Sequence, residues 1–585
     1  MMFTTLSEKQ QALLNQEGQV ILQACPGSGK TFVVAHKLLF DINKWRKKNS
    51  GICMLSFTNV ASNELIKTIF DISGGYRIGY PHFIGTIDSF IAQYLFMPFG
   101  AKVMDCEGIR PSIIQDGHCI NVQKHIDRIW RRECYNLSCK PLDFYYDSED
   151  NLKCIDKDIS SCPLRSGKPC VALKKYCFSK GYATYSDATN ITIKLLRDYP
   201  TISSLICKRF PNIIVDEAQD TSAEQMRIFE LLSQNGVHNL MLIGDPDQAI
   251  YEWRDADPSV FIDKFNCTEW NAQLLNENYR SSQLICNATH VFSSLIETSV
   301  AKGVTALCSF KPQVIKYNDA NKESVVEYFL EKCTEHNIEV SSNNVAVLVR
   351  GKAGLLGKDY STIDDLWQND LTKILADATF EKGNKRIQRA LQLSERALYY
   401  LLVDDTHDNN IIKEKIGKLF LNDKWDEMAL YLCKSLPSSS EKLRDWKVSA
   451  TSLLTSFPQK FNCVYIGNPE IRTKQRVKKT SPLSDFMNQP MRDFFEKSYD
   501  HNGYLNTTIH QVKGRTFEAI LLIVATRGKL TSNMINKKLI DSEAIRTAYV
   551  AMTRARSILM IAIPKSIHNK TLVRFPESCW DFVEL

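Results

Sequence analysis

The sequence predicts an α/β fold in which the strands fall into two separate sets. Three observations carry this prediction: short apolar runs alternate with helical stretches, several of these runs end in polar or acidic residues, and a long polar, helix-rich region separates the two sets. Such alternation is typical of parallel sheets covered by helices. The chain has 585 residues, which exceeds the roughly 100–200 residues of a single domain.

The expected strands of the first set are residues 19–24, 52–57, 213–215 and 240–243, with a helix expected over 30–42. Those of the second set are residues 345–349, 520–524 and 558–562. Two segments break the pattern. Residues 97–195 are rich in cysteine and charge with no clear buried strand, and residues 356–494 are mostly helical before they turn basic. Each is predicted to be an insertion, so the two α/β units would comprise 1–96 with 196–275, and 276–355 with 495–585.

Composition narrows the class of protein. The hydrophobic content of 44% and the charged content of 24% are ordinary for a soluble globular chain. An excess of 73 basic over 66 acidic residues permits nucleic-acid binding without requiring it. No signal peptide is evident, and no apolar run approaches the ~20 residues that span a bilayer. We therefore expect a cytoplasmic protein with reduced thiols that does not act on a membrane.

A glycine-rich segment lies between an expected strand and an expected helix. Its residues are Ala24, Cys25, Pro26, Gly27, Ser28, Gly29, Lys30 and Thr31. The glycines let successive backbone N–H groups face phosphate oxygens, and the helix N-terminus adds its positive dipole. Lys30 would reach the β and γ phosphates, and Thr31 would place its hydroxyl on Mg²⁺. This context predicts a nucleoside triphosphate site, although Ala24 stands where the strict pattern has glycine.

An acidic pair follows the apolar run at 213–215 in the segment NIIVDEAQD. Asp216 would lie near the metal, and Glu217 would orient or deprotonate the attacking water. Acids at a strand end are also common in solvated loops. In combination with the phosphate-binding segment, however, the pair indicates a nucleoside triphosphate hydrolase.

Seven further motifs make the interpretation specific. They are LSEKQQAL (6–13), SFTNVASNEL (56–65), GTIDSF (85–90), GDPDQAIYEWRDA (244–256), LNENYRSS (275–282), TIHQVKGRTFEAI (508–520) and YVAMTRAR (549–556). In type and order they resemble the motifs of the UvrD/Rep/PcrA group of superfamily 1 DNA helicases. The resemblance implies two RecA-like P-loop NTPase domains, each with a largely helical insertion. Such domains clamp ATP between them and move 3′ to 5′ along single-stranded DNA.

The resemblance also implies roles at the nucleotide. Gln10 would pair with the adenine edge, and Tyr279 would stack on the base. Gln248 would sense the γ phosphate, while Arg280 and Arg554 would reach it from the second domain. Arginines supplied across a cleft stabilise the charge of the transferred phosphoryl group and make hydrolysis depend on closure.

The family positions that contact DNA are occupied by Phe57, Thr58, Asn59, Thr86, Tyr251, Trp253, Arg254 and His510. Aromatic rings stack on any base, and polar groups hold phosphates. A lone tryptophan is more often part of a core, but the motif around Trp253 favours a strand contact. The expected partners are single-stranded DNA and junctions of single-stranded and duplex DNA.

The sequence departs from the family pattern at three motif positions. Phe32 stands where close relatives often carry an arginine that packs on the base of ATP. Asp88 replaces a histidine in GTIDSF, which puts a local strand contact in question. Thr516 occupies the position of a ribose-binding glutamate, and Glu518 is the candidate to replace it.

Two features of the insertions leave alternatives open. The first insertion holds eight cysteines, Cys106, Cys119, Cys134, Cys139, Cys154, Cys162, Cys170 and Cys177. Their spacing fits no standard zinc or cluster site, so reduced thiols are favoured over metal binding. The basic stretch from Arg472 to Lys479 would either contact duplex phosphates or form a solvated loop.

The leading function is therefore an ATP-dependent 3′–5′ DNA helicase or translocase. One alternative is a DNA-stimulated ATPase that serves as the sensor component of a defence or repair complex with a partner nuclease, as in compact UvrD-like phage-defence proteins of the Gabija type. A scaffold that binds nucleotide without turnover is the third class, and the intact Lys30, Glu217 and Arg554 argue against it.

Overall fold

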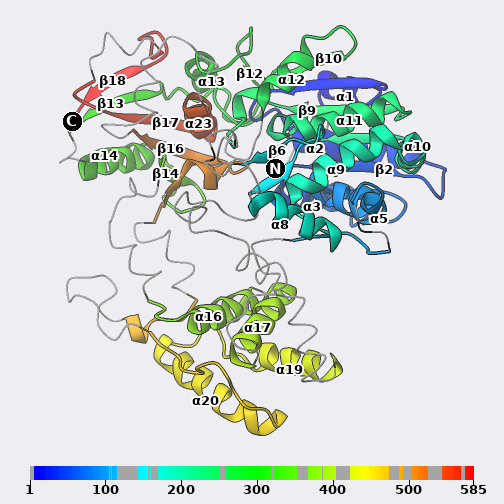
Figure 1. Cartoon of the computed structure of the whole chain (residues 1–585). Helices are drawn as coiled ribbons and strands as arrows, with labels where there is room; N and C mark the ends of the chain where they lie inside the picture. Colours follow the sequence, from blue (N-terminus) through cyan, green and yellow to red (C-terminus); the bar gives the residue numbers. More distant parts are fainter. Residues whose placement is uncertain are drawn as a thin grey trace.

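Two parallel six-stranded sheets organise the computed structural model of the chain (Figure 1). The structure describes residues 6–104, 106, 108–114, 143–155, 159, 162, 169–250, 257–318, 322–351, 366–384, 386–402, 422–473, 486–492, 503–524, 543–567 and 574–585. The two sheets lie beside each other, and a group of helices that includes α16 and α20 lies apart from both.

The first sheet has the strand order β10-β1-β9-β8-β2-β3, and every pairing in it is parallel. Its strands are β1 (Gln19–Ala24), β2 (Ile52–Ser56), β3 (Phe83–Thr86), β8 (Asn212–Val215), β9 (Asn239–Gly244) and β10 (Asn271–Leu275). The central strands are continuous apolar runs because both faces of a parallel sheet are covered. Helices α2 (Lys30–Lys44) and α3 (Asn59–Ile72) pack with one face, whereas α9 (Tyr185–Asp198) and α11 (Ala223–Gln234) pack with the other.

The second sheet has the order β15-β14-β16-β17-β13-β18 and is also entirely parallel. Its strands are β13 (Gln313–Tyr317), β14 (Val345–Val349), β15 (Leu505–Thr508), β16 (Phe517–Ile523), β17 (Ala555–Pro564) and β18 (Asp581–Glu584). Helix α14 (Lys322–Glu335) packs on one face, and α13 (Gln283–His290) with α23 (Glu543–Met552) packs on the other.

Every apolar run predicted as a strand is a strand, with end points shifted by up to three residues. The strands that the pattern missed include β3, β10 and β18, which lie at sheet edges. Their side chains are mostly half-buried or exposed, so they lack the continuous apolar run that marks a strand covered on both faces. Edge position therefore explains these omissions.

The first predicted insertion differs from expectation because its described residues include short strands. β4 (Ser112–Ile113) pairs with β7 (Tyr182–Ala183), and β5 (Phe144–Tyr146) forms an antiparallel pair with β6 (Leu152–Cys154). Each is two or three residues long, which is too short for an apolar pattern to register. Helix α8 (Pro169–Ser179) packs against this hairpin.

The second predicted insertion is helical, as expected, in the residues that the structure describes. Its helices are α16 (Asp370–Gly383), α17 (Ile387–Leu402), α19 (Asn422–Ser435) and α20 (Leu443–Phe461). They share a core of their own, in which the buried Trp446 indole donates to the Thr379 hydroxyl at 3.1 Å. In none of the described helices is there an apolar stretch long enough to cross a membrane.

Candidate active site

The candidate catalytic residues follow the carboxyl ends of three neighbouring strands of the first sheet. β1, β9 and β8 are adjacent in the strand order. The phosphate-binding segment follows β1, Asp216 and Glu217 follow β8, and Asp245 to Gln248 follow β9. Because the strands are parallel, residues more than 200 positions apart in sequence meet at one edge, where α/β sheets usually bind ligands.

The phosphate-binding segment has the backbone that its glycines predict. Gly27 and Gly29 adopt φ values of +77° and +76°, in the left-handed region that other residues rarely enter. A Cβ atom at Gly27 would lie 2.5 Å from Oδ1 of Asn278, so no larger residue fits. The buried Ser28 hydroxyl finds no hydrogen-bond partner among the described residues. The segment leads into α2, whose N-terminus would face a phosphate, so these residues fit a nucleotide.

Lys30 lies against both predicted acids. Its Nζ is 2.6 Å from Oε1 of Glu217 and 3.6 Å from Oδ1 of Asp216. Burial disfavours the charged form of Lys30, but the two carboxylates outweigh burial and raise its pKa. Burial also raises the pKa of Asp216, to about 6. The cluster therefore pairs the predicted phosphate-binding cation with the predicted metal ligand and base.

Glu217 is held in a strained and strongly ionised state. Its φ is +55°, which is uncommon for a residue other than glycine and is often found at functional sites. Burial acts to raise the pKa of Glu217, but the charges of Lys30 and Lys513 outweigh it and lower that pKa to about 2. Gln219 also donates to the second oxygen of this carboxylate at 2.5 Å. Both carboxylate oxygens are thus fixed in position.

Gln248 joins the two sheets through one side-chain amide. Its Nε2 donates to Asp245 at 2.6 Å, and its Oε1 accepts from Nη2 of Arg554 at 2.5 Å. Arg554 is 2% exposed and follows α23 of the second sheet. Burial lowers the pKa of Arg554 to about 10, while Glu217 and Asp245 act against that shift. The predicted γ-phosphate sensor and the predicted second-domain arginine therefore meet directly.

Arg280 and Tyr279 are held next to the phosphate-binding segment. The backbone N–H of Tyr279 donates to the Gly27 carbonyl at 2.8 Å. Nη1 of Arg280 donates to the Thr553 carbonyl at 2.9 Å, beside Arg554. Burial and the neighbouring Arg554 charge lower the pKa of Arg280. Two arginines thus converge on the side of the site that the second sheet provides.

Gln10 is buried at the start of the chain's first helix, α1 (Glu8–Leu14). Its Oε1 accepts from the Ser7 backbone N–H at 3.0 Å, and its Nε2 donates to the Ser28 carbonyl at 3.0 Å. The amide therefore connects the helix cap to the phosphate-binding segment. Its pairing with adenine stays a prediction.

A second link between the sheets was not predicted from the sequence. Nζ of Lys513 lies 2.6 Å from Oδ2 of Asp220 and donates to the Gln248 carbonyl at 3.0 Å. Burial raises the pKa of Asp220 to about 6, and Lys513 acts against that shift. Both residues belong to motifs noted in the sequence, but their pairing across 293 positions leaves no local pattern.

We expect Lys513→Ala to destabilise the protein more than its loss of side-chain contacts would suggest. The substitution leaves the Asp220 carboxylate, 1% exposed, without its cation. Removing one partner of a buried ion pair costs about 3–5 kcal/mol. Urea unfolding would measure the loss, and the double variant Lys513→Ala/Asp220→Asn should recover part of it. Equal losses in the single and double variants would contradict the assignment.

The candidate DNA contacts fall into three groups. Phe57, Thr58 and Asn59 follow β2, and Thr86 ends β3, the strand paired with β2. Thr58 and Thr86 cap α3 and α4 (Ile87–Phe90) through their side-chain oxygens. His510 follows β15 at the edge of the second sheet, and burial lowers its pKa. Tyr251, Trp253 and Arg254 lie outside the described residues.

Two departures from the family pattern can be located. Asp88 accepts a hydrogen bond from Nε2 of Gln225 at 2.9 Å, which ties α4 to α11. Glu518, the candidate ribose ligand, lies on β16, where it accepts from Arg556 at 3.0 Å and from the Ser557 hydroxyl at 3.3 Å. Both carboxylates are thus engaged with protein groups.

The structure describes five of the eight cysteines of the first insertion and only the start of the basic stretch in the second. Of the cysteines that the structure describes here, Cys106, Cys170 and Cys177 are buried, whereas Cys154 and Cys162 are partly exposed. No cluster of three or more metal-ligating side chains occurs in the part of the chain that the structure describes. Cys119, Cys134, Cys139 and most of the basic stretch after Arg472 lie outside it.

Two family models match the chain. One is described as the UvrD/REP helicase N-terminal domain and matches residues 6–139 and 145–268. The other is described as the UvrD-like helicase C-terminal domain and matches residues 468–566. The matched residues contain the phosphate-binding segment, the acidic pair, Gln248 and Arg554, whereas Tyr279 and Arg280 lie between the two matched parts.

Curated relatives agree with these matches. The chain is 24% identical over 634 residues to the ATP-dependent DNA helicase Rep of Buchnera aphidicola, covering 93% of this chain and 90% of Rep. It is 22% identical over 574 residues to the Gabija protein GajB of Bacillus cereus, covering 94% of each chain. A match of 40% over 124 residues to the exonuclease/helicase protein RexA of Streptococcus pneumoniae covers 20% of this chain and only 10% of RexA.

The phosphate-binding segment, the acids after β8 and Arg554, which directly precedes β17 of the second sheet, thus occur in one chain. Models of the N-terminal and of the C-terminal domain of UvrD-like helicases both match this chain. Together with the likeness to Rep and GajB over almost the whole chain, they identify this protein as a UvrD/Rep-like member of the superfamily 1 ATP-dependent helicases.

Proposed function

We propose that the protein is a DNA helicase or translocase that moves 3′ to 5′ along single-stranded DNA at the expense of ATP. The observation that carries the proposal is the Gln248–Arg554 contact at 2.5 Å. It joins a group beside the acidic cluster to an arginine of the other sheet. Hydrolysis would then require the two sheets to close on the nucleotide, which gives a route from chemistry to movement.

The proposed motor domains follow the two sheets. All strands of the first sheet lie within 1–96 and 196–275, and all strands of the second lie within 276–355 and 495–585. This supports two RecA-like domains with boundaries near those positions. Residues 97–195 and 356–494 would be the insertions, although α9 at the end of the first packs into the core of the first sheet.

The residues present also fit Mg²⁺, which prefers oxygen ligands and neutralises phosphate charge. Thr31 and Asp216 would hold it beside the phosphates. Lys30 would neutralise the β and γ phosphates, and a phosphate would compete with Glu217 for the Lys30 ammonium. Glu217 would then accept a proton from the attacking water.

The proposed DNA path runs along the carboxyl ends of β2 and β3 and continues to His510 after β15. Phe57 would stack on a base, and Thr58, Asn59 and Thr86 would hold the backbone. Trp253 would provide the second stacking surface. It follows Gln248 by five residues, so a γ-phosphate sensor and a base-stacking ring would share one short segment.

Trp253→Ala tests this coupling. Stacking on an aromatic ring contributes about 1–3 kcal/mol per base, so single-strand binding should weaken roughly tenfold or more. ATPase activity without DNA should survive, whereas its stimulation by DNA and the unwinding of duplexes should be lost. Fluorescence anisotropy and a coupled ATPase assay give the two readouts. A variant with a lowered melting temperature and no basal ATPase would assign Trp253 to the core instead.

Strand displacement tests the function itself. Duplexes with a single-stranded 3′ tail should be unwound and duplexes with a 5′ tail should not. A protein that moves 3′ to 5′ reaches the duplex only when it starts on a 3′ tail. Unwinding from the 5′ tail alone would reverse the assignment.

A second candidate function is that of a DNA-stimulated ATPase within a defence or repair complex that also holds a nuclease. The match to the Gabija protein GajB over 94% of both chains favours it. In that case ATPase activity would respond to DNA, but the isolated chain would displace no strand from either tail. Co-purification from the native host, followed by mass spectrometry, would then identify a nuclease partner.

A further inference from the structure

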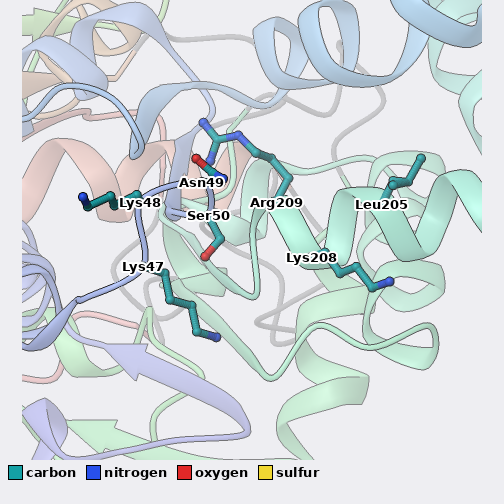
Figure 2. Close-up of a pocket in the computed structure, with 7 residues that line it drawn as sticks. All are labelled: Lys47, Lys48, Asn49, Ser50, Leu205, Lys208 and Arg209. Atoms are coloured by element: carbon teal, nitrogen blue, oxygen red, sulfur yellow. The ribbon is translucent and has the colours of Figure 1, made fainter.

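A basic pocket lies where the segment after α2 meets the end of α10 (Pro200–Arg209), as Figure 2 shows. Its volume is about 470 Å³. The lining residues are Lys47, Lys48, Asn49, Ser50, Leu205, Lys208 and Arg209. Four of these seven side chains are cationic, and none is a carboxylate.

The pocket is separate from the candidate active site. Ser50 stands two residues before β2, and Arg209 stands three residues before β8. Since the strands of the sheet are parallel, the pocket lies at their amino-terminal edge. The phosphate-binding segment and the acidic pair follow the carboxyl ends of the same sheet. The pocket therefore faces away from the nucleotide.

Several contacts fix the shape of the pocket. The Trp45 indole N–H donates to the Ser50 carbonyl at 2.7 Å, which closes the segment between α2 and β2. The Gly51 N–H donates to the Arg209 carbonyl at 2.9 Å and so joins this segment to α10. A Cβ atom at Gly51 would lie 2.0 Å from the Pro81 carbonyl oxygen, so only glycine permits this close packing.

Two residues that line the pocket each carry a buried polar atom with unmet hydrogen-bonding capacity. The Arg209 guanidinium lies 4.2 Å from the centre of the Phe210 ring and 5.3 Å from that of Tyr80, which holds it in place. Its Nη1 is buried and has no hydrogen-bond partner among the described residues. The same holds for the hydroxyl of Ser50, a residue only 8% exposed. Buried polar groups are normally satisfied, so each of these requires an explanation.

The helix dipole explains the position of only some of the four cations that line the pocket. Lys208 and Arg209 are in the last turn of α10, where cations interact favourably with the helix dipole. Lys47 and Lys48 lie beyond the end of α2, and that explanation does not reach them. Within the described part of the chain, no salt bridge involves any of the four cations. Their shared feature is the pocket.

We propose that this pocket binds a phosphate group, either of a nucleic-acid backbone or of a free phosphate compound. Arg209 would present its fixed fork to two phosphate oxygens, which suits arginine better than any other side chain. The Ser50 hydroxyl would donate to the same group. Lys47, Lys48 and Lys208 would neutralise its charge from the rim.

The test uses the full chain loaded with Mg²⁺ and a non-hydrolysable ATP analogue, so that the active site is occupied. Inorganic pyrophosphate is titrated by calorimetry, and a short blunt duplex is titrated by anisotropy at several salt concentrations. The pocket variant is Lys47→Ala/Lys48→Ala/Lys208→Ala. The control variant removes the same charge from exposed lysines elsewhere, as Lys175→Ala/Lys180→Ala/Lys565→Ala. Melting temperatures verify that both fold.

A free phosphate ligand predicts pyrophosphate binding that the pocket variant loses and the control keeps. If the ligand is instead a nucleic-acid backbone, the salt dependence of duplex binding should become weaker in the pocket variant. Each phosphate contact adds close to one to the slope of log affinity against log salt, so that slope should fall by about two to three in the pocket variant only. Ser50→Ala keeps every cation and should weaken the same probe by a smaller factor.

The proposal is overturned if wild-type protein binds neither probe, or if the pocket and control variants behave alike. A poly-glutamate probe separates phosphate recognition from simple attraction to acidic protein. Binding of poly-glutamate as tight as that of the phosphate probes, and equally lost in the pocket variant, would also overturn it.

Discussion

Arg554→Ala is expected to lower the ATPase rate at saturating ATP by about a thousandfold or more, the effect of removing a charge-stabilising arginine from related phosphoryl-transfer sites. Arg554 is 2% exposed and reaches Gln248 of the other sheet. Its charge acts mainly on the transition state, so nucleotide affinity should change far less than the rate. Steady-state ATPase assays and equilibrium binding of a fluorescent ATP analogue separate the two quantities.

The matched control for Arg554 is Arg227→Ala. Arg227 lies on α11, where its side chain is 48% exposed and pairs with Glu230 within the same helix. Exposed pairs of this kind contribute little to stability, and this one is unconnected to the nucleotide residues. The control should retain the wild-type rate. If Arg554→Ala instead weakened binding and left the rate unchanged, Arg554 would be a ground-state contact.

The part of the site that the first sheet provides could largely be predicted from the sequence, because its signals are local. The left-handed Gly27 and Gly29, the strand before them and the helix after them all lie within a few residues. The acids after β8 follow an apolar run that is buried on both faces. In these places one short segment determines both the backbone and the chemistry.

The pairing of distant groups could be predicted only where the family resemblance supplied it. The motif around Arg554 predicts a position near the γ phosphate, and in the structure Arg554 contacts Gln248 across 306 positions. Lys513 and Asp220 also lie in motifs, yet nothing in the spacing of either indicates the ion pair. Such pairs depend on how two sheets are packed together, which no local pattern encodes.

Glu518 illustrates the same limit within one sheet. Its offset from the ribose-binding position made it a candidate, but β16 and β17 pair in a register that brings Arg556 and Ser557 to its carboxylate. Register depends on both strands together. The sequence of β16 alone therefore could not show that Arg556 and Ser557 occupy the Glu518 carboxylate.

Glu217→Gln is expected to leave Mg-ATP binding nearly intact and to lower the hydrolysis rate by about 10²–10⁴-fold, the usual contribution of a positioned general base. The amide preserves the size of the side chain and one oxygen that can accept from Gln219 or Lys30. It cannot take a proton from water. Lys30 would remain available to the phosphates, so affinity for the nucleotide should hold.

Single-turnover hydrolysis and equilibrium binding check the Glu217 prediction, with Glu269→Gln as the control because Glu269 is an exposed carboxylate outside the site. The pKa of Glu217, about 2 beside Lys30, describes a weak base. If a phosphate engaged Lys30, Glu217 would lose the positive charge that does most to lower its pKa. That pKa would then rise toward the range in which a carboxylate accepts protons. Hydrolysis would then require the nucleotide to bind at Lys30 first, and the second sheet to bring Arg554 to the phosphate afterwards. If Glu217→Gln abolished nucleotide binding, the carboxylate would be needed to hold the site together, and the role of base would fall to another group.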